Sequence, residues 1–158
     1  GHLRRTRKNC LYIFQEMISY NFLNEEIPEY NPEFFVLTLP ELIAMEGKEV
    51  GEISLIFCSD EQLLLMNKKH LDHDYYTDVI TFDYTIHNFI SGDVFVSVDR
   101  VRENANVYKT TFHIEMCRVV FHGILHLCGY NDKAEADIVL MRAKEDSYIN
   151  HFVSRETK

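Results

Sequence analysis

The sequence lacks long apolar runs, proline-rich segments and closely spaced cysteines. No run in its 158 residues approaches the length of a transmembrane helix, and no secretory signal is evident. Three prolines are too few for a linker, and no internal repeat or low-complexity tract is present. Cys10, Cys58, Cys117 and Cys128 form no C-x2-C pair, which favours reduced thiols in a cytoplasmic protein. We therefore expect one domain over residues 1–158, with a single core and no membrane association.

The sequence also lacks the excess of positive charge that is typical of nucleic-acid-binding proteins. Its formal net charge is −9, although the charge is unevenly distributed. Basic residues crowd the first part of residues 1–15, which we interpret as a basic N-terminal extension. A second basic group consists of Arg100, Arg102, Lys109 and Arg118. This group could form a local positive surface, but charge alone favours an ordinary solvated helix face.

Capping signals indicate where several helices begin and end. Thr38-Leu39-Pro40-Glu41 is typical of a helix start, with a threonine cap and a proline in the first turn, and Gly47 suits the end. Ser59-Asp60-Glu61-Gln62 predicts a capping box at a second helix start. Residues 11–22 are apolar and fit either a short helix or an edge strand.

Hydrophobic patterning predicts the remaining elements and the fold class. We expect strands over residues 52–57, 78–84 and 93–98, and further helices over residues 99–108, 111–128 and 134–152. Asp99 is the expected cap of the first of these helices. The last helix should bury one apolar stripe, formed by Ile138, Met141, Tyr148 and Phe152. Because apolar residues fall on both faces of the predicted strands, we expect an α+β fold with a small mixed β-sheet covered by helices on both faces.

The helix predicted over residues 111–128 carries two histidines four positions apart. Residues i and i+4 lie on one helix face, so His122 and His126 can bind a single ion. Gly129 suits the left-handed conformation that commonly ends a helix, and the following turn would bring Asp132 back toward both rings. Two imidazoles and a carboxylate are suitable zinc ligands that leave a fourth position open for water. We therefore predict that His122, His126 and Asp132 bind one zinc ion per chain.

Gly123 distinguishes this pattern from that of the zincin peptidases. A zincin metalloprotease has a glutamate after its first histidine as the general base, and glycine cannot take that role. Gly123 therefore argues against peptide hydrolysis without arguing against metal binding. It either leaves room for a large substrate beside a metal or permits close helix packing. The alternative to a metal site is a pair of hydrogen-bonded core histidines with a helix-capping aspartate.

Three sequence blocks carry a resemblance to a known family. Each block alone is weak evidence, but together they are specific because they occur in order and at matching separations. They are Met66-Asn67 with Tyr76-Thr77-Asp78-Val79-Ile80-Thr81-Phe82, then Ser91-Gly92-Asp93-Val94, and then His122-Gly123-Ile124-Leu125-His126-Leu127-Cys128-Gly129-Tyr130. Over residues 52–145 the chain resembles the YbeY family of bacterial endoribonucleases and ribosomal RNA maturation factors. The resemblance implies a zincin-like fold and a metal-dependent endoribonuclease that acts on single strands in small-subunit ribosomal RNA maturation and ribosome quality control. Ribosomal RNA and ribosome-associated proteins are the implied partners.

Two positions depart from the pattern of that family. Most members have a third histidine where this chain has Asp132, and a carboxylate ligand would make the site more anionic. The family also commonly has an arginine six residues before the threonine of its T-D/N-V block, where this chain has Leu71. His70, His73 and Arg118 are the residues that could replace this arginine.

The resemblance implies hydrolysis of a phosphodiester by a metal-bound water, with no catalytic side chain identified. Arg118 lies one helical turn before His122, where it could contact a substrate phosphate or pair with a carboxylate. Two alternatives to the endoribonuclease remain. One is a non-catalytic ribosome-assembly factor with a structural metal, and the other is a zincin-type metallopeptidase.

Overall fold

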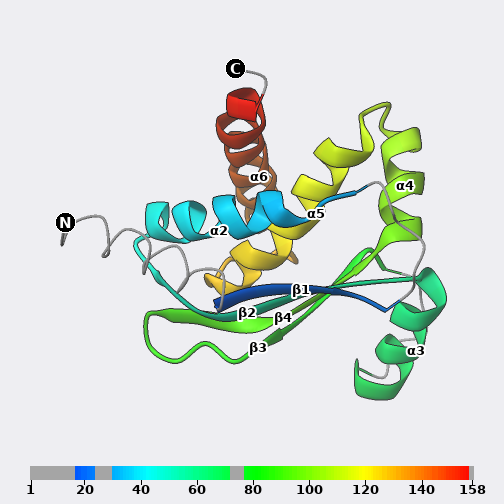
Figure 1. Ribbon diagram of the computed structural model, residues 1–158, viewed down its shortest axis with the longest axis horizontal. Helices are drawn as coiled ribbons and strands as arrows, with labels where there is room; N and C mark the ends of the chain where they lie inside the picture. The colour runs from blue at the N-terminus through cyan, green and yellow to red at the C-terminus, as the bar shows by residue number, and fades with distance from the viewer. Residues whose placement is uncertain (1–16, 24–29, 72–76, 157–158) are drawn as a thin grey trace, which may run out of the picture.

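A mixed four-stranded sheet forms the base of the fold (Figure 1). The computed structural model describes residues 17–23, 30–71 and 77–156. The strands are β1 (Ile18–Phe22), β2 (Glu49–Cys58), β3 (Val79–Asp83) and β4 (Phe89–Ser97), in the spatial order β1-β2-β4-β3. The pairs β1–β2 and β2–β4 are parallel, whereas β3 is antiparallel to β4. Residues 11–22 were predicted to form either a short helix or an edge strand. The structure has an edge strand, β1, in the described part of this segment.

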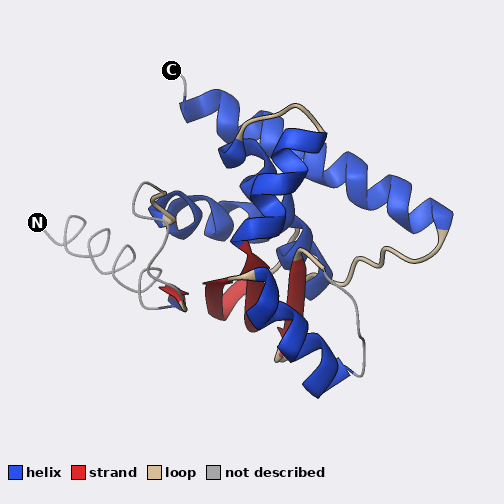
Figure 2. Ribbon diagram, turned by 90° about the vertical axis from the view of Figure 1, so that its right-hand side faces the viewer, coloured by secondary structure: helices blue, strands red, loops and turns tan. Residues whose placement is uncertain are grey.

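Most of the helical layer lies on one side of this sheet. Figure 1 shows α2 (Glu33–Met45), α5 (Phe112–Leu127) and α6 (Glu135–Glu156) on that side, with α4 (Val98–Val107) at the end of the sheet. The view in Figure 2 likewise has most of the helices above the strands. Alternate residues of the strands point into the main core and meet the apolar faces of α2 and α5. Fully buried members of this core include Ile53, Leu55, Val94, Val96, Leu39, Val120 and Ile124.

On the opposite face of the sheet, α3 (Asp60–Leu71) packs over part of the surface, next to β3 and β4. A second, smaller cluster joins Leu63 of that helix to Cys58 and Ile80 of the sheet, with Phe82 and Phe95 packed against it. The prediction of an α+β fold with a small mixed sheet and helices on both faces is therefore confirmed. The two layers are unequal, since the main core is much larger than the cluster beneath α3.

The capping box predicted at Ser59 forms, and the structure adds a cap at Thr111 that was not predicted. The backbone N–H of Gln62 donates to Ser59 Oγ at 3.2 Å, and the backbone N–H of Ser59 donates to Gln62 Oε1 at 3.0 Å. At the start of α5, Thr111 Oγ1 accepts from the backbone N–H of Ile114 at 3.1 Å. The histidine helix is thus fixed at its first turn by its own sequence.

The predicted start of α2 at Thr38 is wrong. The helix begins at Glu33, where Asn31 Oδ1 accepts from the backbone N–H of Glu33, and Pro40 lies inside it. An internal proline costs roughly 3 kcal/mol because it removes one helical hydrogen bond. Burial of an apolar stripe on both sides of Pro40 outweighs that cost; its members are Phe35, Leu39, Leu42 and Ile43.

Two further predictions about helices are corrected. Ser97, the last residue of β4, caps α4 by accepting from the backbone N–H of Arg100, whereas Asp99 Oδ2 accepts from the backbone N–H of Asp60 at 3.0 Å. Asp99 therefore supports the start of α3, not its own helix. In α6, Met141, Tyr148 and Phe152 are buried as predicted, but Ile138 is 48% exposed because the first turn of that helix projects beyond the core.

The predicted basic extension over residues 1–15 lies outside the described residues, as does His73. Within the described part of the chain, no helix combines the length and the apolar character that crossing a membrane requires. Among the described residues, Cys58 and Cys128 form no disulfide.

Candidate metal centre

The structure brings His122, His126 and Asp132 together at one point. Both histidines project from the last two turns of α5, and Gly129 then adopts a φ of +107° that turns the chain back. Asp132 Oδ2 lies 3.1 Å from the Nε2 atoms of both rings, and these two nitrogens are 2.9 Å apart. One ligand atom from each residue can therefore address a single ion.

The second nitrogen of each ring is held by a different acceptor. Nδ1 of His122 lies 2.6 Å from Glu145 Oε2, and Nδ1 of His126 lies 2.9 Å from the carbonyl oxygen of Tyr130. A carboxylate and a carbonyl oxygen only accept, so each Nδ1 donates and the neutral rings carry their lone pairs on Nε2. Two ring lone pairs and a carboxylate oxygen then face one another. Without a cation or a proton between them, this arrangement is repulsive, and it is the arrangement that a divalent ion requires.

Glu145 was not among the residues selected from the sequence. It is 4% exposed and comes from α6, between the buried residues Met141 and Tyr148. A charged residue on the apolar stripe of an amphipathic helix is the signal that could have identified it, because a buried charge needs a partner. The Glu145 carboxylate also forms an ion pair with Arg118, in which Oε1 lies 3.2 Å from Nη1.

Charges around the rings favour a protonated His122 when no metal is bound. Burial lowers the pKa of His122, but the hydrogen bond and charge of Glu145, with the charges of Asp132 and Asp78, outweigh burial and raise it. Asp78 shows the reverse balance, since burial raises the pKa of its carboxyl group more than nearby His122 lowers it. Three carboxyl groups, those of Asp78, Asp132 and Glu145, thus act on His122, and such a cluster of acids suits a cation.

The turn that carries Asp132 is tied to the end of α2. The hydroxyl of Tyr130 donates to Glu46 Oε1 at 2.5 Å, and Tyr148 and Lys144 of α6 also contact the Glu46 carboxylate. The same Tyr130 supplies the carbonyl oxygen that orients His126. The hydrogen bond between Tyr130 and Glu46, which are 84 residues apart in the sequence, therefore helps to position the turn that carries Asp132.

Gly123 permits α5 to lie close against the sheet. A Cβ atom at this position would lie 2.9 Å from Cγ1 of Val94 and 3.3 Å from Cγ2 of Thr81. Of the two interpretations of Gly123, the structure supports close helix packing. A glutamate here would meet β3 and β4, so this position cannot present a general base as the peptidase motif does.

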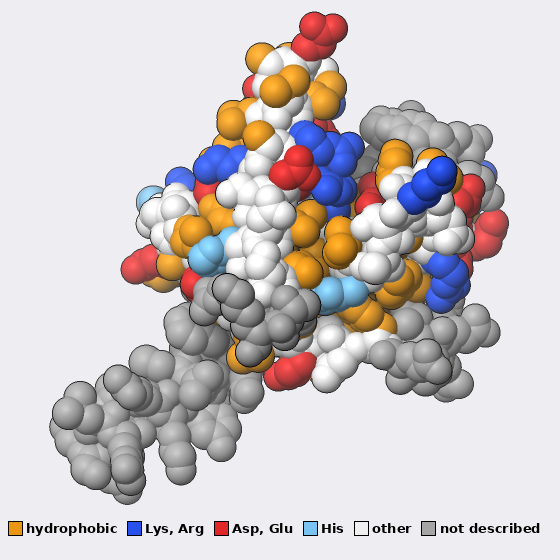
Figure 3. All heavy atoms as spheres, turned by 90° about the horizontal axis from the view of Figure 1, so that it is seen from above, with side chains coloured by type: hydrophobic (Ala, Val, Ile, Leu, Met, Phe, Trp, Pro, Cys, Tyr) orange, Lys and Arg blue, Asp and Glu red, His pale blue; other side chains and the backbone are white. Residues whose placement is uncertain are grey.

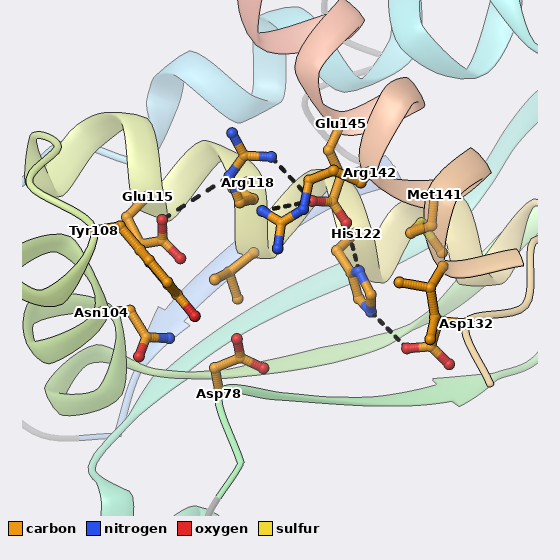
Figure 4. Close-up of a pocket in the computed structure, with 12 residues that line it drawn as sticks. Asp78, Asn104, Tyr108, Glu115, Arg118, His122, Asp132, Met141, Arg142 and Glu145 are labelled. Atoms are coloured by element: carbon orange, nitrogen blue, oxygen red, sulfur yellow. Dashed lines mark hydrogen bonds and ion pairs between the residues drawn. The ribbon is translucent and has the colours of Figure 1, made fainter. Parts of the chain in front are cut away.

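Two cavities meet at the candidate centre. One lies between α4, α5 and α6, the other lies above β3, and His122, Asp132 and Asp78 line both. Figure 4 shows the side chains of the first cavity, with Asp78 below and the His122–Asp132 pair at one side. Substrate could therefore approach the candidate centre from two directions.

Arg118 makes ion pairs near the centre. Its guanidinium lies 2.8 Å from Asp146 Oδ1 and 3.2 Å from Glu145 Oε1, while it also lines the first cavity. The pairing with carboxylates is one of the two roles considered for it. Contact with a phosphate stays a prediction, and Arg142, whose side chain is 57% exposed, lines the same cavity.

The basic group before the histidine helix does not form a uniform positive surface. Arg100 pairs with Asp60 and Glu103, and Arg102 lies over the ring of Phe112. On the face seen from above, Lys and Arg side chains alternate with Asp, Glu and hydrophobic ones (Figure 3). For Leu71, the last residue of α3, the structure describes only the backbone.

The fold and the site define an α+β protein with a candidate metal centre at the end of its core helix. The family model described as endoribonuclease YbeY matches residues 18–153. The endoribonuclease YbeY of Flavobacterium johnsoniae is 49% identical over 136 residues, which cover 86% of this chain and 97% of the relative. That of Phocaeicola vulgatus is 46% identical over 130 residues, which cover 82% and 94%. This chain therefore belongs to the endoribonuclease YbeY family.

A solved structure agrees with this assignment. The solution structure of a Thermotoga maritima protein superimposes with a TM-score of 0.64 at 27% sequence identity, covering 87% of this chain and 91% of the other. Membership of the family supports an endoribonuclease role and thus an RNA substrate.

Proposed function

We propose that this chain is a zinc-dependent endoribonuclease that cleaves single-stranded segments of ribosomal RNA during small-subunit maturation and ribosome quality control. The observation that carries the proposal is the convergence of the Nε2 lone pairs of His122 and His126 with the carboxylate of Asp132 where two cavities meet. Two nitrogens and one oxygen form a donor set that suits zinc and leaves a position for water or a phosphate oxygen.

In this proposal the residues around the ion position the ligands and the substrate. A bound ion would polarise a phosphoryl oxygen and activate water, which reduces the need for a separate general base. Glu145 and the Tyr130 carbonyl hold the imidazole rings in the metal-binding tautomer. Arg118 and Arg142 are the cations that could meet a substrate phosphate from the wall of the first cavity.

The biological setting is proposed from the family. Ribosomal RNA and ribosome-associated proteins are the partners that we propose, in the cytoplasm. The thiols of Cys58 and Cys128, which form no disulfide among the described residues, support a reducing compartment.

The test is a cleavage assay in which the protein is stripped with a chelator and then titrated with zinc. We expect cleavage of a single-stranded ribosomal RNA fragment to require zinc and to be lost in His126→Ala, with casein left intact. Zinc binding without RNA cleavage would favour the assembly factor with a structural metal. Zinc-dependent casein cleavage that His126→Ala abolishes would establish the peptidase instead.

A further inference from the structure

The first cavity continues away from the candidate centre into a recess that the chemistry at the ion does not use. Its volume is about 360 Å³, within the range of sites that bind small organic groups. The far wall is formed by Asn104 of α4, by Tyr108 directly after that helix and by Glu115 of α5 (Figure 4). His122 and Asp132 line the near wall, so a group bound in the recess would lie beside the candidate centre.

Glu115 is a buried acid in the wall of the recess. Its side chain is 4% exposed, and its nearest cation is Nε of Arg118 at a distance of 4.0 Å. Among the described residues, nothing donates a hydrogen bond to its carboxylate. Burial raises the pKa of this carboxyl group, and Arg118 opposes the rise. A ligand that donates N–H groups to both oxygens would offset the cost of burying the charged carboxylate and favour its ionised form.

Tyr108 gives the recess an aromatic wall. This residue directly follows α4, is 61% exposed and lines the cavity. Figure 4 shows the side chains of Tyr108, Asn104 and Asp78 directed toward a common space beside Glu115. Unstacked RNA bases are commonly bound by stacking on an aromatic ring while their Watson–Crick edge forms hydrogen bonds.

We propose that this recess binds the base of a guanine nucleotide adjacent to the phosphate at the candidate metal centre. The proposal rests on the endoribonuclease function proposed above and specifies its substrate. Guanine alone among the four RNA bases presents two neighbouring N–H donors, N1–H and the 2-amino group, on its Watson–Crick edge. A carboxylate accepts both in a bidentate pair. Adenine, cytosine and uracil each place an acceptor beside their donor, and this acceptor would face an oxygen of Glu115.

The experiment measures the binding of 5′-nucleoside monophosphates to the zinc-loaded protein by calorimetry. Monophosphates are not cleaved, so the measurement is independent of ribonuclease activity. GMP should bind most tightly, and IMP, which lacks only the 2-amino group, should bind roughly tenfold more weakly. Tyr108→Ala should weaken the binding of GMP, and Glu115→Gln should remove the difference between GMP and IMP. Val107→Ala is the matched control, because Val107 is 65% exposed on the same turn and does not line the cavity.

Equal affinity for GMP, IMP and AMP would overturn the proposal, as would a GMP preference that survives in both Tyr108→Ala and Glu115→Gln. Because Tyr108 is exposed, its variant tests the recess even if Glu115→Gln proves unstable. Mapping the ends of RNA cleaved by the zinc-loaded protein distinguishes a failure of the guanine proposal from a failure of the proposed endoribonuclease function. Cleavage without a guanine preference contradicts the recess and leaves the endoribonuclease intact, whereas GMP-selective binding without any cleavage contradicts the endoribonuclease.

Discussion

At the scale of single residues, Asp132 is the third side chain of the candidate centre, beside its two histidines. Two imidazoles rarely hold a catalytic zinc without a third ligand. We predict that Asp132→Ala weakens zinc binding by more than the roughly 10- to 100-fold cost of losing a residue that only orients a ligand. Asp132→His should retain zinc, since both side chains are normal ligands. Competition with a zinc indicator measures the affinities, and Asp137→Ala controls for the loss of an acidic residue nearby. Unchanged zinc affinity in Asp132→Ala would reduce Asp132 to a turn residue.

Glu145 and Asp146 form a matched pair that separates ligand orientation from charge. Both pair with Arg118, but only Glu145 contacts a histidine of the candidate centre. We predict that Glu145→Gln lowers zinc affinity roughly 10- to 100-fold, because His122 loses a charged acceptor at Nδ1. Asp146→Asn should change it little. The same indicator titration, with circular dichroism to check folding, measures the effect. A larger loss in Asp146→Asn would contradict the assigned role of Glu145.

Spacing in the sequence made the convergence of His122, His126 and Asp132 predictable, whereas the residues that support them were not predictable. His122, His126, Gly129 and Asp132 lie within one helix end and one turn, so helical periodicity and turn chemistry fix their geometry. Glu145 reaches His122 from a helix 23 residues further along the chain, and no local pattern links the two. The resemblance to the family located the blocks around Asp78, but not the hydrogen bonds that orient the rings.

At the scale of elements, the close packing of α5 on the sheet sets the position of the histidines. A methyl group at residue 123 would crowd Val94 and Thr81. We predict that Gly123→Ala destabilises the protein by about 1–3 kcal/mol despite the better helix propensity of alanine. Urea unfolding of the metal-free protein measures the change, and Ser147→Ala, at an exposed position of α6, is the control. Equal or higher stability would show that the helix shifts freely on the sheet.

The start of a helix was predictable where a local cap determines it. It was not predictable where burial in the tertiary structure determines it. Thr111 and Ser59 cap their helices through local side-chain hydrogen bonds that are legible in the sequence. The start of α2 was misplaced because Pro40 is a strong local stop signal, and burial of the apolar stripe around it is a tertiary effect. Asp99 was misassigned because its carboxylate supports a different helix.

At the scale of the whole molecule, the candidate centre links stability to pH. The pKa of His122 is raised above its ordinary value of 6.5 in the folded protein. A histidine with a raised pKa contributes stability that is complete below its unfolded pKa and lost as the pH rises through its folded pKa. We therefore predict that the metal-free protein becomes less stable as the pH rises from about 6. With zinc bound the trend should reverse, because protons compete with the ion for the ring.

Urea unfolding across pH, with chelator and with excess zinc, measures both trends. Glu145→Gln should flatten the dependence in the metal-free protein, because the hydrogen bond and charge of Glu145 help to raise the pKa. Identical pH profiles with and without zinc would argue against binding at His122.

The central claim is that one ion, held by His122, His126 and Asp132, supports RNA cleavage. The most direct measurement counts zinc per chain by elemental analysis in samples of increasing occupancy and records the RNA cleavage rate in the same samples. We predict that the rate rises in proportion to bound zinc, reaches its maximum at one ion per chain, and is absent in Asp132→Ala at the same total zinc. Full cleavage by protein that contains no metal would contradict it.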